Sequence, residues 1–318
     1  MQPTPETPSI VLLLGVTGSG KTATALPLAE RLDAEIVSVD SMQVYRRMDI
    51  GTAKPTPGER RQVPHHLIDV VEPSEAFSVA RFVDLADGAI AEIAARGRMP
   101  LTVAGTPLYL MGLMYGMFEG PSADEAFRAD LSRRAEHEGL PALHAELARV
   151  DPEAAARIHP NDYKRIERAL EVYHLSGQPL SAQQGQWDAN EMRYPATVVG
   201  IRREKDDASR RINARVKAMI QAGLVDEVRS LLDEPDGLSE QARQALGYAE
   251  IIDHLQGGTG LEEAVERIKI HTRRLAKHQR TWFRKFRTVR WLDVTPDETT
   301  SSICGRLAEL VEAGSDEG

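Results

Sequence analysis

Eight consecutive residues near the N-terminus have the types and spacing of a phosphate-binding loop. They read Gly15-Val16-Thr17-Gly18-Ser19-Gly20-Lys21-Thr22 and fit the pattern Gly-x-x-x-x-Gly-Lys-[Ser/Thr]. Glycines let backbone N–H groups turn towards an anion, and the lysine adds a full positive charge. The threonine hydroxyl can bind a metal ion. We therefore predict that these residues hold a diphosphate or triphosphate, with Mg²⁺ as the cofactor and Thr22 as its ligand.

A second residue that could do chemistry is Asp40, which follows the predicted strand Glu35–Val39. Ligands of parallel sheets bind at the carboxyl ends of the strands. Asp40 and Thr106, which follows the segment Leu101–Ala104, are therefore expected beside the phosphate loop. A carboxylate at this place can accept a proton or interact with magnesium, and the two roles are compatible. Thr106 can also cap the helix that follows it.

The elements that must position these residues alternate between strand and helix in the first third of the chain. Periodicity predicts strands at Ile10–Leu14, Glu35–Val39, Leu67–Val70 and Leu101–Ala104, and helices at Lys21–Leu32 and Val79–Ala95. Such alternation predicts an α/β fold of the P-loop type, in which helices cover both faces of a parallel sheet.

The pattern changes after residue 121, where helical segments follow one another with no strand between them. They are Glu125–Glu138, Pro141–Arg149, Pro152–Ile158 and Asp162–Ser176. We therefore predict an all-helical insertion domain at 122–191 and a core domain made of 1–121 and 192–318. In the core, strands at Ala196–Ile201 and Val289–Leu292 would complete the sheet. The remaining predicted helices are Asp206–Ala222, Val225–Leu232, Glu240–Leu255, Leu261–Phe286 and Thr299–Val311.

Composition excludes several classes of protein. The chain of 318 residues is 42% hydrophobic and has a single cysteine, Cys304, which leaves no intramolecular disulfide and no cysteine-rich metal site. We see neither a signal-peptide pattern nor an apolar run long enough to span a membrane. These features predict a cytoplasmic protein with no membrane partner, and nothing in the sequence indicates a state other than a monomer.

The formal net charge of −9 hides a strongly basic segment. Between Arg267 and Arg290 there are ten lysines and arginines and no acidic residue. A solvated helix normally mixes charges of both signs, so this segment favours contact with a phosphate backbone, through Lys277 and Arg280 among others. The alternative is a merely solvated face. Apolar residues at helical spacing are expected to face the core: Leu261, Val265, Ile268, Leu275, Trp282 and Phe286.

Several segments together resemble the tRNA dimethylallyltransferase (tRNA isopentenyltransferase) family. The longest runs from Ser38 to Pro55, Ser-Val-Asp-Ser-Met-Gln-Val-Tyr-Arg-Arg-Met-Asp-Ile-Gly-Thr-Ala-Lys-Pro, and is followed by Val-Pro-His-His-Leu-Ile-Asp at 63–69. Shorter ones are Ala104-Gly105-Thr106, Ile158-His159-Pro160-Asn161-Asp162, Arg168-Ala169-Leu170-Glu171-Val172, Ala245-Leu246-Gly247-Tyr248 and the stretch Thr272–Phe283. The resemblance extends from about residue 10 to residue 294.

The resemblance implies a reaction and a set of site residues. The family transfers a dimethylallyl group from dimethylallyl diphosphate to N6 of the adenosine 3′ of the anticodon in tRNA, and releases diphosphate. The resemblance implies that Asp40 and Thr106 are catalytic and that Arg215 belongs to the diphosphate site. It also implies that the partner is the anticodon stem-loop of tRNA. The tRNA contacts that it implies are Asp40, Ser41, Met42, Gln43, Thr106, Arg128, Lys164, Arg165, Ile166, Glu167 and Arg168. Gln43 has an amide that can read a base edge.

The sequence departs from the family pattern at a few positions. Val16 and Gly18 lie in the phosphate loop where the family has proline and alanine. Ala104 replaces a glycine, and Arg47 stands where glycine is common. None of these changes removes a reactive side chain.

Two other functions account for part of the sequence. A small-molecule or nucleotide kinase explains the phosphate loop, which is usually an ATP-binding motif, and the helical insertion, but not the basic segment. A non-catalytic RNA-binding switch explains the basic segment but gives Asp40 no chemical task.

Overall fold

The computed structural model describes residues 7–116, 120–121, 123–183 and 191–315. The chain divides into two compact units, one made of residues 1–114 and 192–318 and the other of residues 115–191. The second unit thus begins at residue 115, whereas the sequence placed the boundary at 122. Each unit is described by itself.

The first unit is built on a sheet of six parallel strands in the order β3-β2-β4-β1-β5-β6. The strands are β1 (Ile10–Gly15), β2 (Ala34–Val39), β3 (His65–His66), β4 (Met99–Ala104), β5 (Ala196–Arg203) and β6 (Arg290–Val294). The central strand β1 lies between β4 and β5, so the loops that follow β1, β2 and β4 meet at one edge. The predicted parallel α/β sheet is confirmed.

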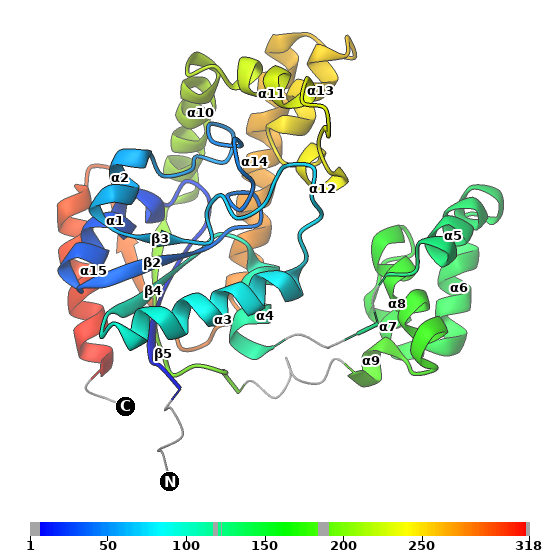
Figure 1. The fold of residues 1–318 in the computed structure, drawn as a ribbon, viewed down its shortest axis with the longest axis horizontal. Coiled ribbons are helices and arrows are strands. Elements are labelled where there is room, and N and C mark those ends of the chain that lie inside the picture. The colour runs from blue at the N-terminus through cyan, green and yellow to red at the C-terminus, as the bar shows by residue number, and fades with distance from the viewer. Residues whose placement is uncertain (1–6, 117–119, 122, 184–190, 316–318) are drawn as a thin grey trace. The chain divides into compact units, whose positions relative to one another are not determined.

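Helices cover both faces of this sheet (Figure 1). On one face, α1 (Lys21–Arg31) packs beside α15 (Thr300–Ser315), and their apolar residues share a core with Leu13, Ile36 and Leu292 of the strands. The other face receives α3 (Val79–Ala95), which packs on β2 and β4. α3 keeps its place because it buries Phe82, Ile90 and Ile93 on one stripe. α4 (Pro107–Tyr115) follows β4.

A second group of helices in this unit stands over the carboxyl edge of the sheet. It comprises α10 (Lys205–Gln221), α11 (Leu224–Leu232), α12 (Glu240–Arg243), α13 (Tyr248–Leu255) and α14 (Leu261–Phe283). α14 packs against both α10 and α13. The predicted continuous helix at Glu240–Leu255 is wrong, because Gly247 has φ of 94° and separates α12 from α13.

In the second unit, every regular element among the described residues is a helix. The helices are α5 (Glu125–Glu138), α6 (Leu140–Val150), α7 (Pro152–Arg157), α8 (Tyr163–Ser176) and α9 (Leu180–Gln183). They surround a small core that includes Leu131, Leu143, Leu147 and Leu170. Across both units, no described helix is long and apolar enough to cross a lipid bilayer.

The predicted strand at Leu67–Val70 is also wrong. The strand β3 is limited to the two residues before it, and Leu67 and Asp69 have positive φ values of 63° and 56°. Left-handed residues cannot continue a strand. The chain therefore turns here, and the short helix α2 (Pro57–Gln62) precedes β3.

The buried carboxylate of Glu35 links β2 to β3 and to the end of α3, and it allows a test of the fold. Glu35 on β2 accepts hydrogen bonds from Arg96 at 2.7 and 3.2 Å, its side chain is 7% exposed, and His66 Nε2 lies 2.7 Å from Oε2. The Arg96 hydrogen bonds, with a further contribution from His66, lower the pKa of Glu35.

We expect Glu35→Gln to lower the free energy of unfolding at neutral pH by about 1–3 kcal/mol, because an ionised acceptor is lost. The wild-type advantage should vanish as the pH falls through the depressed pKa of Glu35, since its carboxylate is then also neutral. Urea unfolding at neutral and acidic pH measures this. Glu312→Gln, in an exposed pair 3.9 Å from Arg31, is the control and should change little. A Glu35→Gln deficit that persists unchanged in acid would contradict the assignment.

Candidate active site

Asp40 stands at the carboxyl end of β2 with its carboxylate fixed by the backbone. Its Oδ1 atom accepts hydrogen bonds from the backbone N–H groups of Met42 at 2.9 Å and Gln43 at 3.3 Å. This turn uses one carboxylate oxygen and sets the plane of the group. Among the described residues, Oδ2 has no hydrogen-bond partner, so it is the oxygen that can act on a substrate.

Lys21 faces the same point as the free oxygen of Asp40. A Cβ atom built on Gly105 would lie 3.1 Å from Asp40 Oδ2 and 3.7 Å from Lys21 Nζ. Glycine at 105 therefore keeps open the space between acid and ammonium. Burial lowers the pKa of Lys21 to about 8, the negative charge of Asp40 acts in the opposite direction, and the positive charge of Arg215 adds to the lowering.

These groups line a cavity of about 220 Å³. Its charged and polar lining includes Thr17, Lys21, Thr22, Asp40, Thr106 and Arg215. Its apolar lining comes from α10, α14 and the segment before α13: Ile212, Met219, Leu246, Ile268 and Leu275. Burial lowers the pKa of Arg215, with Asp40 opposing it. The cavity thus combines groups that can bind an anion with apolar side chains, which suits an amphiphilic substrate.

The phosphate loop is shaped by its glycines and by α10. Gly18 has φ of 86°, and a Cβ atom there would lie 2.9 Å from the backbone oxygen of Ala208. A fully buried Ser19 turns its hydroxyl inwards, 3.4 Å from the backbone N of Lys21, and Arg203 donates a hydrogen bond to its carbonyl oxygen. Val16 is buried as well. The side chains of Val16 and Ser19 therefore shape the loop, and only their backbone can reach an anion.

Thr106 and Ser41 tie the ends of β4 and β2 together. The Thr106 hydroxyl accepts a hydrogen bond from Ser41 N–H at 3.0 Å and donates one to Ser41 Oγ at 3.3 Å. Its hydroxyl thus bonds the loop after β2, and no hydrogen bond to the first turn of α4 is present among the described residues. Both residues border the cavity, so their predicted contact with a base stays a prediction.

Gln43 has a different environment from the one that we expected. Its side chain is 9% exposed; Oε1 accepts a hydrogen bond from Ser38 at 2.9 Å, and Nε2 donates to the backbone oxygens of Thr52 and Ala53. The amide thus braces the loop between β2 and α2. Reading of a base edge by Gln43 would require these bonds to break.

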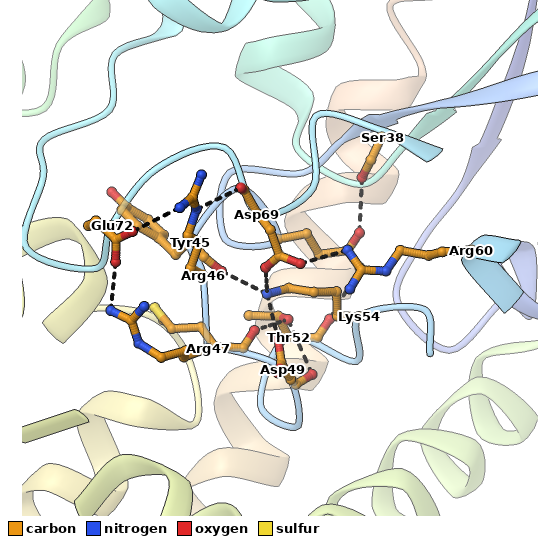
Figure 2. A network of polar contacts seen from close by, with 12 residues as sticks. Ser38, Tyr45, Arg46, Arg47, Asp49, Thr52, Lys54, Arg60, Asp69 and Glu72 are labelled. Atoms are coloured by element: carbon orange, nitrogen blue, oxygen red, sulfur yellow. Dashed lines mark hydrogen bonds and ion pairs between the residues drawn. The ribbon is translucent and has the colours of Figure 1, made fainter. Parts of the chain in front are cut away.

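The same loop is closed by a buried lysine (Figure 2). The Lys54 side chain, which is 2% exposed, donates to the backbone oxygen of Tyr45 at 2.7 Å and to the carboxylates of Asp49 and Asp69, both at 2.6 Å. Arg60 also pairs with Asp69. These contacts fix the loop that begins with Ser41, and therefore the direction in which Asp40 points.

Arg47, where the family commonly has glycine, keeps a glycine-like backbone with φ of 61°. Its guanidinium pairs with Glu72 at 2.6 Å and with Glu234 at 2.7 Å (Figure 2 shows the Glu72 contact). A left-handed backbone is unfavourable for arginine, and these two ion pairs hold its side chain in place. The departure from the family pattern therefore preserves the shape of the loop.

Two of the predicted tRNA contacts in the second unit, Arg128 and Arg168, pair with one buried carboxylate. Glu171 is fully buried and pairs with Arg128 at 2.7 Å and Arg168 at 2.6 Å, although both guanidiniums stay about one third exposed. Arg165 pairs with Asp162. The assignment of Ile166 is wrong for its side chain, which is fully buried because residues 164–168 form more than one helical turn and one of them must face the core. Lys164 and Glu167 stay predictions.

The predicted core face of the basic helix α14 is only partly right. Ile268 is buried as predicted, and so is Phe286 just beyond the helix, but Leu261 and Leu275 are exposed and Val265 and Trp282 are half-buried. The buried residues of the helix are Ala264, Ile268, Lys269, Thr272, Ala276, Gln279 and Phe283. Small residues are buried because α10 and α13 approach closely. The expected lack of acidic partners is only partly right, since Arg267 pairs with Asp253 and Lys269 with Glu266. The side chains of Lys277 and Arg280 make no ion pair with any described residue.

Sequence analysis missed two cavity residues on α14, Thr272 and Gln279. Both are almost fully buried, at 8% and 3% exposure. The sequence does contain a pattern that could have identified them, because Thr272 and Gln279 are seven positions apart and lie on the same helix face as Ile268. We did not use this pattern, because we assigned the apolar residues of the helix to the core and did not consider its uncharged polar residues.

Comparison with known proteins gives matches over nearly the whole chain. The IPP transferase family matches residues 43–286, and the isopentenyl transferase family matches residues 8–69. A tRNA dimethylallyltransferase from Geobacillus thermodenitrificans is 48% identical over 297 residues, which cover 92% of each chain. One from Methylococcus capsulatus is 47% identical over 311 residues, covering 97% of this chain and 98% of the relative.

Solved structures agree. The tRNA isopentenylpyrophosphate transferase of Bacillus halodurans has a TM-score of 0.69 at 43% identity, covering 97% of this chain and 98% of its own. A eukaryotic dimethylallyltransferase, studied while acting on tRNA, has a TM-score of 0.72 at 28% identity, covering 90% of this chain and 73% of its own. The family matches span every residue that lines the cavity.

Proposed function

Because the chain belongs to the family of tRNA dimethylallyltransferases, also described as IPP transferases, we propose that it acts on N6 of the adenosine 3′ of the anticodon. It is a prenyltransferase that transfers a dimethylallyl group to tRNA. The observation that carries the finer proposal is the approach of Asp40 Oδ2 and Lys21 Nζ to one point beside Gly105. One group can accept a proton and the other can bind a departing anion.

The amine of adenine needs help as a nucleophile, because its lone pair is delocalised into the ring. As the new C–N bond forms, N6 loses a proton, and Asp40 Oδ2 is placed to accept it. Its partner oxygen, Oδ1, is fixed by Met42 and Gln43. The carboxylate therefore does not have to reorient when the substrate arrives, which lowers the cost of reaching the transition state.

The leaving diphosphate would bind where the positive groups converge. Lys21, Arg215 and the N–H groups of the phosphate loop can stabilise the negative charge that grows on the departing oxygen. This role agrees with the lowered pKa of Lys21, since an incoming anion reverses the unfavourable burial of its charge. ATP is not required as a substrate in this proposal.

The residues present fit a magnesium ion that is shared with a diphosphate. Thr22 offers a hydroxyl at the cavity, and the described residues contain no group of three or more His, Cys, Asp and Glu side chains that would hold a metal alone. Mg²⁺ commonly takes few protein ligands and completes its shell with phosphates and water. Thr22 would hold the ion, which would neutralise charge on the leaving group.

The base must leave its stack to enter the cavity, as in other enzymes that modify bases. An anticodon loop, already single-stranded in part, lowers the cost of this step. The apolar lining residues Ile212, Leu246 and Leu275 suit both an adenine face and a short prenyl chain. Action on the anticodon stem-loop, as a monomer in the cytoplasm, stays part of the proposal.

We expect Asp40→Asn to slow dimethylallyl transfer by about 10²–10⁴-fold, since the amide can still accept the Met42 N–H but cannot accept a proton. The measurement is mass spectrometry of tRNA nucleosides after single turnover with dimethylallyl diphosphate and Mg²⁺. Binding of tRNA should persist. Transfer by the variant at the wild-type rate would exclude Asp40 as the base.

We expect Gly105→Ala to reduce transfer at least about tenfold, because its methyl group would enter the space between Asp40 and Lys21 and displace the carboxylate. Gly88→Ala on α3, where an added Cβ meets nothing within 4 Å, is the matched control and should leave transfer unchanged. Equal activity of the two variants in the same nucleoside assay would show that the gap is not needed.

We expect Lys277→Ala and Arg280→Ala each to weaken tRNA binding and reduce the slope of its salt dependence by about one, because one phosphate contact is lost. Filter binding over a range of salt concentrations measures the slope. Arg306→Ala, which removes an exposed arginine paired with Glu298, is the control. Unchanged slopes for both α14 variants would assign this face of the helix to solvent.

A further inference from the structure

One buried side chain of the basic helix α14 bonds both the phosphate loop and the loop that follows β4. Gln279 on α14 is 3% exposed. Its Oε1 atom accepts a hydrogen bond from the backbone N–H of Thr17 at 2.7 Å, and its Nε2 atom donates one to the backbone oxygen of Gly105 at 2.5 Å. A single amide therefore bridges the phosphate loop and the loop after β4.

The two backbone groups that Gln279 bonds are next to the reacting groups. Thr17 belongs to the loop that presents Lys21, and Gly105 flanks the gap between Lys21 and Asp40. From the other side, the N–H groups of Gly105 and Thr106 both donate to the backbone oxygen of Val39 at 3.0 Å, directly before Asp40. Gly105 is thus fixed between Gln279 and the end of β2.

The chemistry of the bridge requires an amide. Thr17 supplies a donor and Gly105 an acceptor, so the bridging group must accept at one atom and donate at the other. A glutamate of the same length keeps the acceptor, but when ionised it places a carboxylate against the Gly105 carbonyl. A protonated glutamate restores the donor. Alanine removes both bonds.

We propose that Gln279 is a positioning residue for prenyl transfer, which sets the separation between the phosphate loop and the Asp40 edge. This inference rests on the proposed function. Gln279 itself does not touch the reacting atoms in this account; it acts through Thr17 and Gly105. Displacements of about 1 Å at such a place cost on the order of 10²-fold in rate. Both atoms of its amide are already bonded to backbone groups, so we do not assign it a hydrogen bond to tRNA.

The test is the pH dependence of single-turnover transfer by Gln279→Glu relative to wild type. At neutral pH we expect the variant to transfer the dimethylallyl group about 10 to 100 times more slowly than wild type. The ratio of variant to wild-type rate should rise towards one as the pH falls, because the introduced glutamate becomes protonated and again donates to the Gly105 carbonyl. Asp40, Lys21 and Arg215 line the same cavity in both proteins, so the ratio removes the part of the pH dependence that the two proteins share. Binding of tRNA should match wild type throughout.

Three measurements keep the outcome decisive. Gln241→Ala, which loses hydrogen bonds to Phe77 N–H and the Tyr45 hydroxyl away from the cavity, should retain the wild-type rate. If Gln279→Glu does not fold, Gln279→Ala carries the test and should lower the transfer rate with tRNA affinity unchanged. A pH-independent ratio near one for Gln279→Glu, or a loss confined to tRNA affinity, would overturn the proposal. Absence of product from wild type would instead refute the proposed function.

Discussion

The chemistry depends on a carboxylate and an ammonium that face each other across a glycine. Asp40 directly follows β2, and Lys21 begins α1 after the phosphate loop that follows β1; the parallel sheet brings both strand ends to one edge. Gly105 leaves the space between them empty. Burial makes the charge on Lys21 costly, and Arg215 adds a second cation. The site therefore has two cations, Lys21 and Arg215, beside one carboxylate. An entering anion stabilises these buried cations, which favours binding of the diphosphate end of the substrate here.

The surrounding structure limits how this edge can move. Arg203, almost fully buried and paired with Asp207, bonds the phosphate loop through Ser19. Lys54 closes the loop that follows Asp40. Each of these two buried charges has several hydrogen-bond or ion-pair partners, because burying a charge without a partner would destabilise the fold by several kcal/mol. They are therefore well suited to fix a site that must not relax when its substrates bind.

Much of the architecture followed from the sequence, and the exceptions have physical causes. The glycine loop and the strand ends placed Lys21 and Asp40 correctly, since local patterns determine both. Helix breaks such as that at Gly247 depend on backbone conformation, which periodicity does not show. The buried face of α14 was missed because its polar residues, such as Gln279, are satisfied by partners far along the chain. Contacts of that kind exist only after folding.

A crystal structure with Mg²⁺ and inorganic pyrophosphate would show whether the leaving group binds beside the gap between Lys21 and Asp40. We expect pyrophosphate within hydrogen-bonding distance of Lys21 and the phosphate loop, with the free oxygen of Asp40 facing it across an open gap. Pyrophosphate bound elsewhere, or an Asp40 carboxylate turned away from the cavity, would contradict it.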